Sequence, residues 1–331
     1  ITDYEIDPES CLIEAVVNEY DDIVKLLLDA NVSPEIMNHG RPLIHDTVEH
    51  KNNVTRNALL EKNSNLSLLT DQMGNTFLHR AALTNQPNSI KVGVEEFKID
   101  VNTKNKLGLT PLLLLIEKES NDFKENFQYL VQKGADVSII NKKQKNILHL
   151  CVENNNLKAL KALIGSRKND SEVLLTKEQI STLLNEKDCD GLTPLEFASK
   201  RSNDYKCAYI ISKYVQLPIF DSKITLESLN EHESKGFSPN VYNKEGIPLL
   251  ICSLLQYETD KEQTITIIQK LMKMKANPSL PDKSTKLMPI HYAIKLGSKE
   301  LVQILMENGA NFLVEPRSEE RRVGKECRSR W

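Results

Sequence analysis

The stretch GNTFLHRAAL, from Gly74 to Leu83, decides how this sequence folds. It places His79 among leucine, phenylalanine and alanine side chains. A histidine in such surroundings can be a metal ligand, a catalytic base or a packing residue. If the stretch recurs along the chain with its histidine in place, the residue belongs to the architecture of a repeat rather than to one site.

The stretch does recur. Aligned on Gly74, the segments GRPLIHDTV from Gly40 and GLTPLLLLI from Gly108 each lie 34 residues away. Less regular spacing follows, with QKNILHLCV, GLTPLEFAS, GIPLLICSL and KLMPIHYAI, and a weaker copy, PESCLIEAV, comes first. The eight copies start near residues 8, 40, 74, 108, 144, 191, 246 and 286.

A period near 33 residues with a T-P-L-H-x-A core resembles the ankyrin repeat, which consists of a β-turn and two helices. The resemblance covers roughly residues 7–316, and the second helices match it in DIVKLLLDANVSPEIMN, YLVQKGADVSIINKK and ELVQILMENGAN. It implies an all-α solenoid of stacked helix-turn-helix units whose turns project to one side. The motif glycine is missing in three copies and the histidine in four.

The residues support this fold without the family name. Thr110 and Thr193 can cap a helix, and the proline after each suits the first turn. Gly134 and Gly309 follow a helix pattern, where a left-handed cap is favoured. An Asp or Asn stands three residues before the motif start in five copies and predicts a tight turn. These residues are Asp71, Asn105, Asn141, Asp188 and Asn243.

His45, His79, His149 and His291 occupy one position in four copies. In ankyrin repeats, this histidine ties the turn to the start of the first helix. Stacked copies would spread the four side chains along the array, so we interpret them as structural and expect no metal site. Replacing one should leave local polar groups unpaired.

Two long intervals between copies predict insertions at about residues 165–187 and 216–240. Thr176 and Gln179 have the spacing of a capping box, and Thr225 with Leu226 and Leu229 suggests another helix. The insertions can be simple loops between helix pairs, degenerate repeats or elements that bind a partner.

The last residues, 317–331, read RSEERRVGKECRSRW and resemble a translated sequencing adapter, so we exclude them from the fold. This hypothesis makes residues 1–316 the native array and, with Ile1 at the start, suggests a fragment of a longer protein. The six cysteines are scattered without a C-x-x-C pair, which favours a reduced, cytoplasmic protein. No apolar run reaches the length of a membrane helix.

Common catalytic signatures are missing. The closest glycines, Gly236 and Gly246, are ten residues apart, so the sequence has no dinucleotide fingerprint, P-loop or nucleophile elbow. It also lacks H-E-x-x-H and basic stretches interleaved with aromatics. The formal net charge is −3. We therefore expect no catalytic residues, cofactor or nucleic-acid partner.

The leading hypothesis is a non-catalytic, monomeric scaffold that binds a protein or peptide. The alternative is the regulatory region of a larger enzyme, channel or ubiquitin-ligase adaptor. In ankyrin arrays, contacts come from the turns and the exposed ends of the first helices. Apolar residues after the motif start would be exposed anchors or would pack on neighbouring turns, and charged residues would line the concave face. The expected contact residues are Lys106, Leu109, Glu117, Lys118, Glu153, Asn154, Asp190, Leu192, Lys200, Arg201, Ile247, Leu287, Lys295 and Leu296.

Overall fold

The computed structural model describes residues 7–50, 53–165, 173–201, 205–215, 217–220, 223–234 and 237–310. The chain divides into two compact units, residues 1–198 and 199–331. The adapter-like tail, 317–331, lies outside the described residues, as do residues 166–172 of the first predicted insertion.

The first unit is a series of short helices, as the repeat predicts. Its elements are α1 (Pro8–Val17), α2 (Asp21–Asp29), β1 (Met37–Asn38), β2 (Arg41–Pro42), η1 (Leu43–Glu49), α3 (Val54–Lys62), η2 (Ser64–Leu68), α4 (Phe77–Leu83), α5 (Pro87–Glu95), α6 (Pro111–Leu114), α7 (Phe123–Gln132), α8 (Ile147–Glu153), α9 (Leu157–Ile164), α10 (Lys177–Asn185) and α11 (Pro194–Lys200), which runs across the boundary at residue 198. The short β1–β2 hairpin is the only sheet among the described residues.

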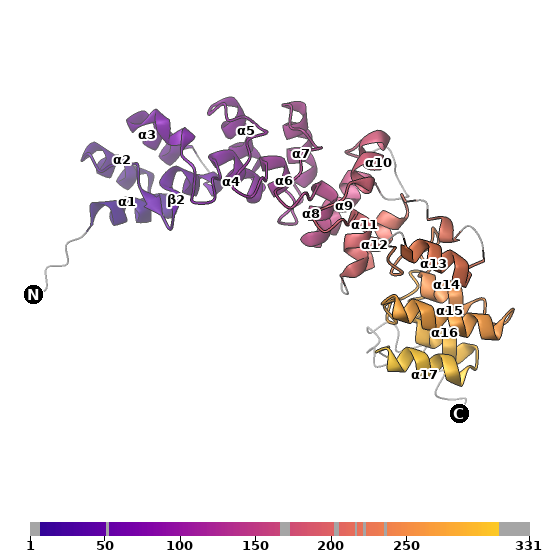
Figure 1. Cartoon of the computed structure of the whole chain (residues 1–331). Helices are drawn as coiled ribbons and strands as arrows, with labels where there is room; N and C mark the ends of the chain where they lie inside the picture. Colours follow the sequence, from indigo (N-terminus) through magenta and orange to yellow (C-terminus); the bar gives the residue numbers. More distant parts are fainter. Residues whose placement is uncertain are drawn as a thin grey trace, which may run out of the picture. The chain divides into compact units, whose positions relative to one another are not determined.

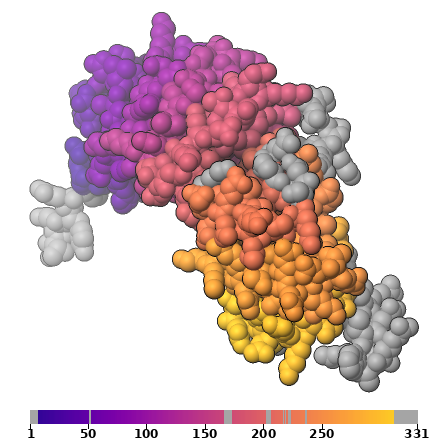
Figure 2. Space-filling model, turned by 45° about the vertical axis from the view of Figure 1, so that its right-hand side comes forward, coloured from indigo at the N-terminus to yellow at the C-terminus, as the bar shows by residue number. Residues whose placement is uncertain are grey.

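Consecutive repeats stack side by side within this unit. In Figure 1, α4, α6 and α8 follow one another in one row, and α5 and α7 form a second row above them. Helix α4 packs against both α5 of its own repeat and α6 of the next. Figure 2 shows the repeats of this unit packed against one another without a break. Each repeat therefore buries its apolar side chains against its neighbours.

Polar side chains fix where the first helices begin. The Thr76 hydroxyl caps α4 by accepting the His79 N–H at 3.4 Å, and Thr110 does the same for Leu113 at α6. Pro111 follows directly as the first residue of α6. Thr193 likewise accepts the Glu196 N–H at 3.4 Å. The caps at Thr110 and Thr193 confirm the sequence prediction, and each satisfies an N–H that has no partner inside its helix.

The turns before the first helices form a ladder along the unit. The Asn105 side-chain oxygen accepts the N–H groups of Leu107 and Leu109, both at 2.9 Å. Asp71, Asn141 and Asp188 hold their turns in the same way, which confirms the tight-turn prediction. Adjacent turns are also joined, since the Lys106 N–H donates to the Met73 carbonyl at 2.9 Å.

The second unit contains α12 (Tyr205–Ser212), η4 (Pro218–Phe220), α13 (Leu226–Ser234), α14 (Leu249–Leu254), α15 (Lys261–Lys273), α16 (Pro289–Lys295) and α17 (Lys299–Glu307). Helices α14 and α15 form one pair and α16 and α17 the next, with α14 against α16 and α15 against α17. This arrangement repeats the stacking seen in the first unit.

Both insertions contain the helix that the sequence suggests. In α10, the Thr176 hydroxyl accepts the Gln179 N–H at 3.2 Å, and the Gln179 side chain accepts the Thr176 N–H at 2.9 Å. Thr225 caps α13 by accepting the Ser228 N–H at 3.1 Å, and Leu229 of α13 is fully buried. Helix α10 packs against α8, and α13 packs against α15.

Candidate partner-binding groove

A groove of about 310 Å³ lies between the repeats that start at Gly108 and Gln144. We call it the α6–α8 groove. Its walls come from the first helices of both repeats, from the residues that follow those helices and from the turn around Asn141. Four of the predicted contact residues line it, namely Leu109, Glu117, Glu153 and Asn154.

The groove has an apolar floor. Leu109, Leu113 and Leu150 line it and are 7%, 1% and 6% exposed, respectively. Leu107, at the tip of the preceding turn, also lines the groove and is 49% exposed. A side chain of a partner would therefore meet a firmly packed apolar surface with one exposed leucine at its edge.

Two carboxylates stand at the helix end of the groove. Glu117 and Glu153 occupy the same repeat position, four residues after the histidine position. The pKa of the Glu117 carboxyl is raised above its ordinary value because neighbouring groups shield it from water. Lys118 opposes this shift, and Glu153 adds to it. The raised pKa reflects the cost of a charged carboxylate at this position, and a cation beside Glu117 would offset that cost.

Lys145 holds the second of these carboxylates. Its Nζ lies 2.7 Å from the Glu153 Oε1, and its side chain is only 7% exposed. The same Nζ lies 4.3 Å from the centre of the Phe197 ring. Lys145 is thus fixed by an ion pair and an aromatic face, and it holds Glu153 in place at the groove.

The turn end of the groove is basic. Lys142 and Lys143 line it, and both are exposed. Their turn is held by the Asn141 side chain and by the Lys142 N–H, which donates to the Leu107 carbonyl at 3.0 Å. The groove therefore has opposite charges at its two ends and leucines between them.

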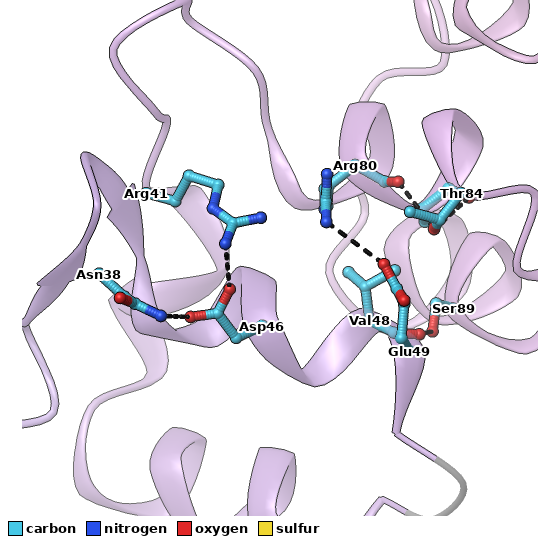
Figure 3. A network of polar contacts seen from close by, with 9 residues as sticks. Asn38, Arg41, Asp46, Val48, Glu49, Arg80, Thr84 and Ser89 are labelled. Atoms are coloured by element: carbon cyan, nitrogen blue, oxygen red, sulfur yellow. Dashed lines mark hydrogen bonds and ion pairs between the residues drawn. The ribbon is translucent and has the colours of Figure 1, made fainter. Parts of the chain in front are cut away.

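An equivalent carboxylate near the start of the array is already paired. Glu49, four residues after His45, accepts a bond from the Arg80 guanidinium at 3.2 Å. Figure 3 shows this pair beside a second cluster, in which the Asp46 carboxylate accepts a hydrogen bond from Asn38 and forms an ion pair with Arg41. Arg80 belongs to the next repeat, so this pair links neighbouring repeats.

The apolar residues directly after the motif start are less exposed than anchors for a partner would be. Leu109 is buried, and Leu192, Ile247 and Leu287 are half-buried. The backbone of Leu109 is also fixed, because its N–H donates to the Asn105 side chain and its carbonyl accepts from the Nε2 of His79 at 3.1 Å. The alternative, packing on neighbouring turns, describes Leu109 better.

The exposed apolar turn residues stand elsewhere. They include Met73 and Leu107, 43% and 49% exposed, each directly before its motif glycine. Neither was predicted from the sequence. The glycine at the next position adopts a positive φ, +74° at Gly74 and +76° at Gly108. The positive φ of the glycine leaves the side chain of the preceding residue at the tip of the turn. Exposed apolar residues could therefore have been predicted at the position directly before each motif glycine.

The remaining predicted contact residues do not line the α6–α8 groove. Lys106 and Lys118 are exposed, and each is the sequence neighbour of a residue that lines the groove. The Lys106 Nζ donates to the Gln72 carbonyl at 2.8 Å. Asp190, Lys200 and Arg201 are exposed around α11. In the second unit, Lys295 is exposed and Leu296 is half-buried.

The histidines of the repeat bridge turns and helices. His79 is fully buried, its Nδ1 accepts the Thr76 N–H at 3.2 Å, and its Nε2 donates to the Leu109 carbonyl of the next repeat. His149 makes the equivalent bond to the Leu192 carbonyl at 2.9 Å. Among the described residues, no three His, Cys, Asp or Glu side chains are grouped as metal ligands would be.

Family models match two parts of the chain. A model of ankyrin repeats in three copies matches residues 93–173, and a single ankyrin repeat matches residues 287–315. The chain is an ankyrin repeat protein. The first match includes both repeats that form the α6–α8 groove.

Several known proteins resemble this ankyrin chain. It is 46% identical over 65 residues to alpha-latrocrustotoxin-Lt1a of Latrodectus tredecimguttatus, covering 20% of this chain and 4% of the toxin. It is 25% identical over 250 residues to the transient receptor potential cation channel subfamily A member 1 of Homo sapiens, covering 74% and 18%. It is 26% identical over 281 residues to the putative ankyrin repeat protein FPV024 of Fowlpox virus, covering 74% and 43%.

The chain thus spans less than half the length of each of these relatives. In the part of the chain that the structure describes, no helix has the length and apolar character needed to span a membrane.

Proposed function

We propose that this ankyrin array is a non-catalytic, monomeric interaction module of the cytoplasm, and that it binds a protein segment in the α6–α8 groove. The observation that carries the proposal is the convergence of Leu107, Glu117 and Glu153 around one apolar floor on the first-helix side of the array. Ankyrin arrays bind other proteins on such surfaces, and no catalytic signature in the sequence calls for another activity.

The chemistry of the groove defines the segment it would accept. An apolar side chain would cover Leu113 and Leu150, and a lysine or arginine beside it would lie between the two glutamates. An acidic residue would face Lys142 and Lys143 at the other end. A protein segment offers this spacing of acidic, apolar and basic groups more readily than a nucleic acid does.

A peptide selection tests this function. Peptides selected from a random library on the purified chain should combine an apolar residue with a neighbouring lysine or arginine. Replacing Leu107→Ser or Glu117→Lys should lower their affinity at least tenfold, because each change removes one groove contact. The matched controls Val131→Ser and Glu125→Lys change exposed residues of α7, away from the groove, and should leave the affinity unchanged.

The result would contradict the proposal if the groove variants and their controls bound the selected peptides equally. Leu109 is unsuitable for this test, since its burial and its bond to His79 would make a serine there destabilise the array. Melting curves of the four variants should overlap with that of the parent chain.

A second candidate function rests on the match to the human cation channel over 74% of this chain. In that case the array would be the ankyrin region of a larger membrane protein or enzyme. A complete transcript would decide between the two candidates, because an effector or membrane domain in the same reading frame would favour the second.

A further inference from the structure

The outer face of the first repeat is apolar and open to solvent. Val17, Tyr20, Ile23 and Leu26 are 50%, 52%, 47% and 69% exposed. Ile23 and Leu26 are three residues apart in α2, which places them on one side of that helix, whereas Val17 ends α1 and Tyr20 directly precedes α2. Together they form what we call the α1–α2 outer face.

The other side of the same helices is a normal repeat interface. Val16 and Val24 are fully buried and Leu28 is 2% exposed. Helix α2 packs there against α3, and α1 packs against η1. The first repeat therefore has two apolar faces, of which the described residues cover only one.

The last described repeat shows which neighbouring repeat, the preceding or the following one, covers each side of the second helix. Helices α2 and α17 have the same register, because each has nine residues and ends two residues before a positive φ, at Asn31 and Gly309. In this register Ile23 corresponds to Leu301 and Leu27 to Leu305. Leu301 and Leu305 are fully buried, whereas Ile23 is 47% exposed and Leu27 is half-buried.

The opposite positions show the inverse pattern. Val24 and Leu28, buried in α2, correspond to Val302 and Met306 in α17, which are half-buried and 48% exposed. Helix α17 packs on α15 of the preceding repeat. The positions of Ile23 and Leu27 are thus those that a preceding repeat covers, and the positions of Val24 and Leu28 face a following repeat.

We propose that a further ankyrin repeat of the same protein precedes α1 and packs on the α1–α2 outer face. A repeat that ends an array carries polar residues on its outer side, since an apolar face there would remain in water. The α1–α2 outer face has the apolar residues of an internal repeat instead. The relatives named above are longer than this chain, which covers 4% to 43% of their length.

The coding sequence upstream of Ile1 provides the first test. We expect it to encode another turn and helix pair with apolar residues at the positions equivalent to Val24 and Leu28 of its second helix. These side chains would meet Ile23 and Leu27. A reading frame that has a stop codon directly upstream of Ile1 would overturn the proposal. Polar residues at the positions equivalent to Val24 and Leu28 would overturn it as well.

The second test compares the present chain with one extended by its own upstream segment. Ile23→Glu with Leu26→Glu should lower the melting temperature of the extended chain by several degrees and leave the 331-residue chain nearly unchanged. The control Lys25→Glu alters an exposed residue of the same helix and should change neither.

Equal effects of the double variant in both chains would contradict the proposal. A second copy covering the α1–α2 outer face would also contradict it, and sedimentation would show this as a dimer of the 331-residue chain that Leu26→Glu converts to monomers. Neither result depends on the α6–α8 groove, so the two proposals can fail separately.

Discussion

At the scale of single residues, the repeated histidine is the clearest link between sequence and structure. Its recurrence in four copies predicted a structural role for His79 and its counterparts. The sequence could not identify the carbonyl that His79 binds, because Leu109 is 30 residues away and comes close only when the repeats stack. The side chain of Leu109 is 7% exposed, which favours the alternative in which it packs on its neighbours over the one in which it is an exposed anchor.

The pH dependence of stability should reflect these buried histidines. Burial lowers the pKa of His45 from 6.5 to about 4, with smaller opposing effects from the Leu69 carbonyl and Asp71. Because the folded pKa is the lower one, the unfolded chain binds more protons in acid, and stability falls as the pH drops below about 6.5. Between pH 7 and pH 5 the loss from this residue should be about 2 kcal/mol.

Urea unfolding of the parent chain and of His45→Gln at both pH values measures this loss. The variant should lose less stability between pH 7 and pH 5, since it lacks the titrating ring. An equal loss in both proteins would assign the pH dependence to other groups. The pKa values of His79 and His149 are also lowered by burial, so some dependence should persist in the variant.

His149 offers a test of the structural role against metal binding. Replacing His149→Leu removes its ring bonds to the Leu192 carbonyl and to the Asn146 side chain, at 2.9 Å each. Both groups keep another partner, the Asp188 N–H at the Leu192 carbonyl and the Leu148 N–H at the Asn146 side chain, so the cost is that of two lost hydrogen bonds. We expect a cost on the order of 1 kcal/mol in urea unfolding. A chelator should leave the melting temperature of the parent chain unchanged, and a fall on adding chelator would refute the structural assignment.

At the scale of secondary-structure elements, the sequence predicted several helix starts and turns. Caps such as Thr110 and turn residues such as Asn105 bond to residues within a few positions of themselves, so their partners can be read from the sequence. The first helix of the second repeat differs, because Leu43–Glu49 forms a 3₁₀ helix. The bonds between neighbouring turns were not predicted, since they join residues about one repeat apart.

Alanine substitutions at two glycines distinguish two contributions to stability, the positive φ of a turn and its contact with the neighbouring turn. Gly108 has a φ of +76°, and a Cβ there would lie 2.9 Å from the Lys142 backbone nitrogen. Gly134 has a φ of +93°, and a Cβ there would meet nothing within 4 Å. Gly134→Ala should therefore cost about 1 kcal/mol from the positive φ alone, and Gly108→Ala clearly more because the neighbouring turn must move.

Thermal or urea unfolding of the two variants tests this difference. The Gly108→Ala variant should also weaken peptide binding, because Lys142 lines the α6–α8 groove. Equal costs at the two glycines would mean that the turns are not held together as tightly as their backbone bonds indicate.

At the scale of the whole molecule, the period predicted the repeat array but not its division into two units. The boundary at residue 198 falls inside α11, in a repeat that begins with the well-matched motif GLTPLEFAS. How well a motif matches the repeat pattern indicates only how well that one repeat folds. The match does not show how much apolar surface neighbouring repeats bury against each other, and this buried surface decides where an array divides into units.

The sequence nevertheless predicts one cooperative array, and calorimetry can test it. Leu12 and Leu160 in the first unit and Leu271 in the second are fully buried. Replacing each by alanine should cost about 2–5 kcal/mol, because a cavity replaces packed methyl groups. If repeats transmit stability to their neighbours along the chain, all three variants should lower a single melting transition. Two transitions, one sensitive to Leu12→Ala and Leu160→Ala and the other only to Leu271→Ala, would show instead that the units unfold independently.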